Sequence, residues 1–333
     1  MDYKKKLIDT WDIISQETEK KNNKVYRVVL NHKYITVRAC ILGQSKNKSI
    51  EFVYNKTFFL KKLFNNIDTN GLEIQIIKDL EDSKNNIISI KLKKNSLLEI
   101  YLEFIENIIK YIQPLNNKDE IINLIIKKID IWIKFFKREK FDGLSEEEIR
   151  GLIGELLFIK NFSKNKENFK NNIIRWKGCE NGLHDFEFQK TKVEIKTFSS
   201  TGKIRITYPD QLDIDTFPEI YLVCFNLTKD NGNFSLNSII NLIKKSIDEK
   251  TLIIFEDKLK NAGYFEIHKN NYNDEYNNSK KYCYKIVKEF PKILYKELND
   301  SISKVSYSLD TNLLSSFDIG SKQIEDIIGD KKN

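Results

Sequence analysis

Residues 184–198 read HDFEFQKTKVEIKTF, and this stretch decides the fold of the region around it. Apolar and charged side chains alternate along it, which is typical of strands that have one face in a core. A tight turn at residues 190–191 would fold the stretch into a hairpin. The predicted register pairs Phe188 with Val193, so that the apolar side chains of the two strands meet.

Charged side chains gather on one face of this predicted hairpin. Glu194 and Lys196 share a face because side chains alternate along a strand. The register places Asp185 opposite Lys196 and diagonal to Glu194, with the two carboxylate Cβ atoms roughly 6–8 Å apart. Two carboxylates at that separation can hold one divalent ion, and Mg²⁺ prefers oxygen ligands at about 2.1 Å. We expect Asp185 and Glu194 to bind Mg²⁺, for which Mn²⁺ could substitute.

Lys196 lies beside this expected metal site and has three candidate roles. It could orient the attacking water, deprotonate it, or offset charge that develops in a transition state. The alternative is a solvated strand edge, because a D-x8-E-x-K pattern arises easily by chance in a chain with 31% charged residues. Glu187, on the same face, illustrates that alternative and is expected to be a surface group.

A helix is predicted immediately upstream, in LSEEEIRGLIGELLFIKNF (144–162). Ser145 and Glu148 form a capping box, as Ser96 and Glu99 do before an earlier helical segment. Gly151 and Gly154 lie inside the later helix, where each glycine costs about 1 kcal/mol relative to alanine. We therefore expect another element to approach this helix closely.

Glu155 follows the second of these glycines. A carboxylate on a helix that packs beside the hairpin could complete the metal shell of Asp185 and Glu194. The alternative is an ordinary glutamate that faces solvent.

A helix that carries a glutamate, followed by strands that carry D…ExK, resembles the PD-(D/E)XK nuclease superfamily. The stretch GLIGELLFI…W.G…HDFEF…VEIKT…QL (151–212) is similar to one bacterial family of PD-(D/E)XK proteins, whose members occur beside DNA methyltransferases and ATPases in restriction or phage-defence gene clusters. The likeness extends to KEFPKI…ISKVSYSLD (288–310) and, more loosely, to the β-rich N-terminus. One departure is that His184, and not proline, precedes the aspartate.

The resemblance implies that four residues occupy the active-site positions of the superfamily: Glu155, Asp185, Glu194 and Lys196. It implies Mg²⁺ as cofactor and DNA as substrate.

Several polar residues are weaker candidates for DNA contacts. His184 could touch the leaving phosphate, although a histidine at a strand start is more often structural. Gln211 could lie near the lysine or the DNA backbone, or could be an ordinary polar residue at a helix start. Trp176 is expected in the core. The basic residues that precede the site could meet phosphates or line a solvated loop: Lys164, Lys166, Lys170, Arg175 and Lys177.

Composition limits the other classes of protein. The chain has 333 residues and a net charge of +8, which permits a nucleic-acid partner without requiring one. Its four cysteines form no CxxC pair and it has only three histidines, so neither a zinc cluster nor a disulfide framework is expected. No uncharged apolar run approaches the roughly 18 residues of a membrane span. We expect a cytoplasmic protein without a membrane partner.

The order of expected elements suggests two domains. Residues 1–115 are expected to form a β-rich accessory domain that ends in a helix. Residues 116–333 are expected to form a helical bridge and a PD-(D/E)XK nuclease-like α/β domain of restriction-endonuclease type, with a mixed central sheet flanked by helices. Within it we expect a loop at 164–172, a strand at 173–178, a buried central strand at 219–227 and a frayed tail after 320.

The function expected from these features is Mg²⁺-dependent endonuclease cleavage of DNA in a bacterial restriction or phage-defence system. The alternative is a non-catalytic DNA-binding or scaffolding subunit that retains the nuclease fold. Methyltransferase and ATPase subunits are candidate partners by the resemblance. A homodimer, a requirement for partner subunits and RNA in place of DNA all remain open.

Overall fold

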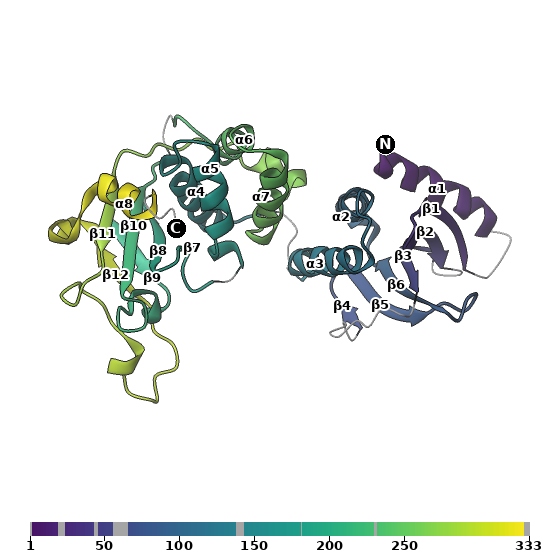
Figure 1. Cartoon of the computed structure of the whole chain (residues 1–333), viewed down its shortest axis with the longest axis horizontal. Helices are drawn as coiled ribbons and strands as arrows, with labels where there is room; N and C mark the ends of the chain where they lie inside the picture. Colours follow the sequence, from purple (N-terminus) through teal and green to yellow (C-terminus); the bar gives the residue numbers. More distant parts are fainter. Residues whose placement is uncertain are drawn as a thin grey trace. The chain divides into compact units, whose positions relative to one another are not determined.

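The computed structural model describes residues 2–18, 24–42, 46–55, 66–137, 143–180, 182–229 and 232–329. The chain divides into two compact units, residues 1–141 and residues 142–333 (Figure 1). The domain boundary expected at 115 lies before the helix α3 (Lys118–Phe136). The structure groups α3 with the first unit, because Phe104 of the preceding helix packs against Trp132 of α3 with ring centroids 5.2 Å apart.

The first unit is built on an antiparallel sheet with the strand order β1-β2-β3-β6-β5-β4. β-branched and aromatic residues dominate these strands, as expected for a pleated, half-buried surface. The strands are β1 (Val25–Asn31), β2 (Ile35–Leu42), β3 (Asn47–Asn55), β4 (Ile67–Asp68), β5 (Leu72–Lys78) and β6 (Asn85–Leu92).

Two further helices, α1 (Tyr3–Thr18) and α2 (Leu98–Ile112), join α3 in this unit. Trp11 of α1 donates from its indole nitrogen to the Cys40 carbonyl at 3.1 Å, and Tyr101 of α2 donates to the Ile90 carbonyl at 2.7 Å. These side chains are fully buried, and their rings stack with centroids 6.0 Å apart. The predicted capping box at Ser96 is absent, because a 3₁₀ turn, η2 (Asn95–Leu97), begins this helix.

The second unit contains a mixed sheet with the order β11-β10-β8-β7. β10 runs parallel to β8, and the other two pairings are antiparallel. β10 is buried along nearly its whole length, as predicted for a central strand. A separate two-stranded sheet pairs β9 with β12. The strands are β7 (Phe186–Glu187), β8 (Thr191–Phe198), β9 (Lys203–Ile206), β10 (Glu219–Asn226), β11 (Lys281–Lys285) and β12 (Tyr307–Asp310).

Each face of the mixed sheet has its own hydrophobic core. On one face, Val193, Ile195 and Val223 belong to a core that also contains residues of α4, which packs on β8, and of α6, which packs on α4. On the other face, Leu222 and Cys224 pack with residues of β9, of the 3₁₀ helix η4 and of the chain after β11, and no α-helix among the described residues contributes to that core. The helices of this unit are α4 (Glu146–Asn161), α5 (Lys166–Arg175), α6 (Leu236–Lys245), α7 (Glu249–Asn261) and α8 (Gly320–Gly329).

The structure therefore has the mixed α/β character expected from the sequence but differs in three local elements. The expected loop at 164–172 and strand at 173–178 form α5 instead, because Asn165 caps the helix and Phe169 and Ile173 bury its apolar side. The tail expected to be frayed forms α8, which is held by the fully buried Ile324; residues 330–333 lie outside the described residues. None of the described helices combines the length and apolar character needed to cross a bilayer.

Candidate active site

The β7–β8 hairpin that carries the predicted site has a register two residues away from the predicted one. Phe186 pairs with Val193 and Glu187 pairs with Lys192, so the predicted pairing of Phe188 with Val193 was wrong. The turn instead comprises residues 189–190. A slip of two residues leaves every side chain on its predicted face, because the strand period is also two. The slip moves Glu187 away from Glu194, and Glu187 forms an ion pair with Lys192 at 3.0 Å.

Glu194 and Lys196 form a close ion pair on one face of β8. Lys196 Nζ lies 2.5 Å from Glu194 Oε1, and the same oxygen accepts from Gln211 Nε2 at 2.8 Å. The Glu194 side chain is 2% exposed and that of Lys196 is 17% exposed. The second oxygen, Glu194 Oε2, is buried with no hydrogen-bond partner among the described residues. An unpartnered buried carboxylate oxygen is costly, so it indicates a ligand position.

Asp185 lies just before β7 and is turned toward β8. Its Oδ2 accepts from the Ile195 backbone N–H at 2.7 Å. Its backbone carbonyl accepts from the N–H groups of Lys177 and Gly178 at 2.7 and 3.0 Å. These three bonds fix the aspartate between β8 and the segment that follows α5. Asp185 and Glu194 therefore come together, as predicted. The observed register, continued to Asp185, places it level with Glu194, so the predicted position opposite Lys196 was wrong.

Glu155, on α4, completes the group of acidic residues. The Trp176 indole nitrogen donates a short hydrogen bond to Glu155 Oε2. Gly178 lies between the carboxylates: a Cβ atom at this glycine would be 2.4 Å from Asp185 Oδ1 and 3.2 Å from Glu155 Oε2. The side chains of Glu155 and Asp185 thus converge on the same small space, and any larger residue at 178 would fill it.

The close approach expected at the glycines of α4 occurs at one of the two. A Cβ atom at Gly154 would lie 2.6 Å from Thr197 Cγ2 and 3.2 Å from Ile195 Cγ2, so β8 packs directly on this residue. A Cβ atom at Gly151 would meet nothing within 4 Å, and the expectation was wrong there. The contact at Gly154 lets α4 approach β8, which brings Glu155 to the hairpin.

Burial raises the pKa of all three carboxyl groups, and repulsion between carboxylates adds to the rise at Glu155 and Glu194. Burial first, and then the Asp185 charge, raise the pKa of Glu155 well above its usual range. The same two causes raise the pKa of Glu194 to about 8, against the opposing effect of Lys196. Burial also raises the pKa of Asp185. Burial disfavours the charged form of Lys196, but Glu194 and Asp185 outweigh it and raise the pKa of that amine. Lys196 is therefore a cation at neutral pH.

These groups fit a divalent cation in part. The unpartnered Glu194 Oε2 and the raised carboxyl pKa values indicate that this site does not favour negative charge unless a further cation is bound. Carboxylate oxygens are the ligands that Mg²⁺ prefers. Among the described residues, however, no three His, Cys, Asp or Glu side chains are grouped as a ready metal site. Asp185 and Glu194 fit the ion, and the predicted third ligand, Glu155, lies beside Asp185 with its Oε2 held by the Trp176 indole N–H.

The residues predicted to contact DNA separate into two groups. His184 is 1% exposed, and its Nε2 lies 2.9 Å from the Gln211 carbonyl. Gln211 is 7% exposed and also donates to the Leu183 carbonyl at 3.2 Å. Burial lowers the pKa of His184. The structure thus buries both residues inside the unit, where Gln211 donates to Glu194 and His184 contacts the Gln211 carbonyl.

Three of the five basic candidates, Lys164, Lys166 and Arg175, line a pocket of about 870 Å³ beside the hairpin turn. Lys164 already pairs with Glu325 at 2.8 Å. Lys170 and Lys177 are not part of that lining, and Lys177 pairs with Glu180 at 2.8 Å.

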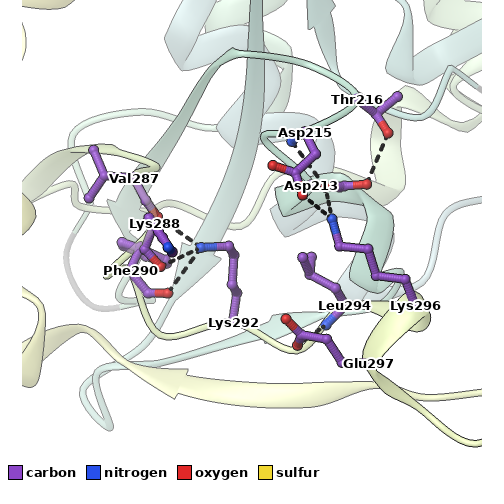
Figure 2. A network of polar contacts seen from close by, with 10 residues as sticks. All are labelled: Asp213, Asp215, Thr216, Val287, Lys288, Phe290, Lys292, Leu294, Lys296 and Glu297. Carbon is purple, nitrogen blue, oxygen red and sulfur yellow. Dashed lines mark hydrogen bonds and ion pairs between the residues drawn. The ribbon is translucent and has the colours of Figure 1, made fainter.

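The loop after Gln211 is anchored to the C-terminal part of the unit. Gln211 belongs to η4 (Pro209–Leu212). Figure 2 shows Lys296 reaching Asp213 and Asp215 from the segment after β11; the Asp213 contact is 3.3 Å. Thr216 also donates to Asp213, at 2.9 Å. These contacts hold the segment that presents Gln211 to Glu194.

Sequence reasoning missed the roles of Trp176 and Gly178. Trp176 was expected only in the core; it is fully buried, but its indole N–H also holds Glu155. The tight W-x-G spacing was the only sequence signal for either residue.

A helix-borne glutamate beside a sheet that carries an aspartate, a glutamate and a lysine is the arrangement of a PD-(D/E)XK protein. The chain belongs to the DUF4420 family, described as "Putative PD-(D/E)XK family member", which it matches over residues 7–312. Searches of curated proteins and of solved structures each gave no match.

Proposed function

We propose that the protein is a Mg²⁺-dependent DNA endonuclease whose active site comprises Asp185, Glu194 and Lys196, with Glu155 beside them. The family description supports a nuclease-like function. The observation that carries the proposal is the buried, unpartnered Glu194 Oε2 next to Asp185 and an ammonium group. A purely structural sheet would have little reason to bury two carboxyl groups and an ammonium group together, since burial of ionisable groups is costly even when they are paired.

Each residue has a distinct task in this proposal. Asp185 and Glu194 would hold the ion, fixed by the Ile195 N–H and by Gln211. Bound Mg²⁺ would polarise the scissile phosphate and lower the pKa of the attacking water. Lys196, a cation at neutral pH, would stabilise negative charge on the reacting phosphate. Its raised pKa favours this charge-stabilising role over the alternative in which Lys196 deprotonates the water.

The distribution of charge supports a division of labour between the units. Residues 1–141 contain 27 Lys and Arg against 18 Asp and Glu, a net charge of +9. Residues 142–333 contain 29 and 30, a net charge of −1. Affinity for nucleic acid without sequence preference comes from neutralised phosphates. The first unit would therefore supply most of this affinity, and the second unit the chemistry.

A plasmid assay tests the function. Full-length protein is incubated with unmodified supercoiled DNA and Mg²⁺, and in parallel with EDTA. The proposal predicts nicked or linear product that EDTA and Asp185→Asn both abolish, while gel shifts in Ca²⁺ show that the variant still binds DNA. Cleavage by Asp185→Asn at the wild-type rate would refute the site. Binding without any cleavage by the wild type, with candidate partner subunits present, would favour the scaffolding alternative. A parallel RNA substrate decides between the two nucleic acids.

The restriction or phage-defence setting is part of the proposal and derives from the family resemblance alone. Genes for a methyltransferase and an ATPase next to this gene would support it.

A further inference from the structure

Lys258 is a buried lysine near the carboxylates, and the proposed chemistry does not use it. Lys258, on α7, is 4% exposed. Its Nζ donates a short hydrogen bond to the Trp176 carbonyl and pairs with Glu180 Oε1 at 2.7 Å. Burying an ammonium group is costly unless it is paired and hydrogen-bonded, so these two contacts fix the lysine in place.

Trp176 connects this lysine to the site. Its carbonyl accepts from Lys258, and its indole N–H donates to Glu155 Oε2. The tryptophan is fully buried and lies in a bridge to Phe186 at the start of β7. Its ring lies 6.3 Å from that of Phe255, which is also on α7. The ring is therefore packed in the core with its N–H directed at the Glu155 carboxylate.

The residues after Trp176 reach the site as well. The N–H groups of Lys177 and Gly178 both donate to the Asp185 carbonyl. Gly178 leaves room for the Asp185 and Glu155 side chains, since a Cβ atom there would lie 2.4 Å from Asp185 Oδ1 and 3.2 Å from Glu155 Oε2. Glu180 ends this short segment, and Lys258 holds it there. Lys258 thus binds both ends of the segment, through the Trp176 carbonyl and the Glu180 carboxylate.

We propose that Lys258 is a positioning residue of the active site: by holding residues 176–180 against α7, it keeps the Trp176 indole N–H on Glu155 and the Gly178 backbone on Asp185. The effect on catalysis rests on the proposed nuclease function. The positioning itself does not, and it can be measured in the protein without metal or DNA. Lys258 touches no reacting atom in this scheme.

The test uses the indole N–H signals of full-length ¹⁵N-labelled protein in solution. Trp176→Phe identifies the Trp176 signal, and Glu155→Gln shows how that signal moves when a neutral acceptor replaces the carboxylate. We expect Lys258→Met to move the Trp176 signal in the same direction as Glu155→Gln. Trp11, which donates to Cys40 in the first unit, is the internal reference and should not move.

Lys177→Met is the matched control. Lys177 also pairs with Glu180, at 2.8 Å, but its amine does not contact Trp176. Its side chain is 41% exposed against 5% for Lys258. We expect this variant to leave the Trp176 signal in place. An equal shift in both lysine variants would overturn the proposal, because it would show a general response to the loss of charge near Glu180.

An unchanged Trp176 signal in folded Lys258→Met would also overturn the proposal. If that variant does not fold, Glu180→Gln replaces it in the test, because it removes the carboxylate that pairs with Lys258. We expect a smaller shift of the Trp176 signal in the same direction. An unchanged signal in Glu180→Gln would contradict the proposal.

In the cleavage assay, we expect Lys258→Met to slow turnover about 10–100-fold, as removal of a supporting residue typically does, with DNA affinity unchanged. An unchanged turnover would refute the catalytic consequence. If the wild type does not cleave with candidate partner subunits present, the proposed function fails, and the indole signal still decides the positioning.

Discussion

Replacing Lys196 with methionine tests the charge at the centre of the proposed chemistry. The variant keeps most of the side-chain volume and removes the ammonium group that lies 2.5 Å from Glu194 Oε1. Glu194 would lose the cation that opposes the rise in its pKa, which is already about 8. It would therefore hold its proton more tightly at neutral pH, and the fold would not have to hold an uncompensated buried charge.

The expected loss concerns catalysis more than binding. A preorganised donor at a developing charge contributes about 10²–10³ in rate, or roughly 3–4 kcal/mol. Affinity for DNA arises from many phosphate contacts. The Lys196 side chain is only 17% exposed, so the loss of this one cation should change the affinity little. We expect Lys196→Met to reduce single-turnover cleavage at least 100-fold while the dissociation constant for DNA in Ca²⁺ changes only slightly.

Lys192→Met is the matched control for this prediction. Lys192 lies on the same strand and is 16% exposed, and it also pairs with a carboxylate, Glu187, at 3.0 Å. It does not contact Glu194 or Asp185. Cleavage by Lys192→Met should stay near the wild-type rate. Equal rates for Lys196→Met and wild type, or equal losses in the two lysine variants, would refute the role given to Lys196.

Three further predictions concern stability and binding. Gly154→Ala should destabilise the protein by about 1–3 kcal/mol in urea unfolding, because its Cβ would overlap Thr197. Gly151→Ala should instead stabilise it by up to about 1 kcal/mol, because its Cβ would meet nothing within 4 Å. A stabilised Gly154→Ala would contradict the packing of α4 on β8. Between pH 4.5 and about 8, Glu194 keeps its proton in the folded protein but has lost it in the unfolded chain. The free energy of unfolding of the metal-free protein should therefore fall as the pH rises through this range, and Glu194→Gln should make the fall less steep. An identical slope in the variant would contradict the pKa shift. The salt dependence of DNA binding should weaken more when exposed lysines are replaced by glutamine in the first unit than in the second, and equal effects would contradict the division of labour. The first-unit set is Lys78, Lys84 and Lys94, and the second-unit set is Lys203, Lys245 and Lys250.

The shared face of the site residues could be predicted because it depends only on the strand period. Asp185, Glu194 and Lys196 stay on one face in both the predicted and the observed register, which differ by two residues. The register itself could not be predicted, because the turn at Gln189 and Lys190 lacks the Asn-Gly or Asp-Gly signal that fixes a two-residue hairpin. The position of α4 followed from the capping box at Ser145, which the structure contains.

Contacts between residues distant in sequence could not be predicted. Gln211 reaches Glu194 only because η4 packs over β8 and β10, and Lys258 reaches Trp176 across 82 residues. The helix α5 was missed because its asparagines have low helix propensity, while its stability comes from the burial of Phe169 and from its cap. In each case tertiary packing decided a feature that local sequence left open.

Manganese binding by the full-length protein tests the central claim most directly, because it depends neither on the DNA sequence nor on partner subunits. Calorimetric titration of wild type, Asp185→Asn and the surface control Glu187→Gln gives the comparison. The account predicts a Mn²⁺ site in the wild type that Glu187→Gln retains and Asp185→Asn loses. Equal binding by wild type and Asp185→Asn would contradict it.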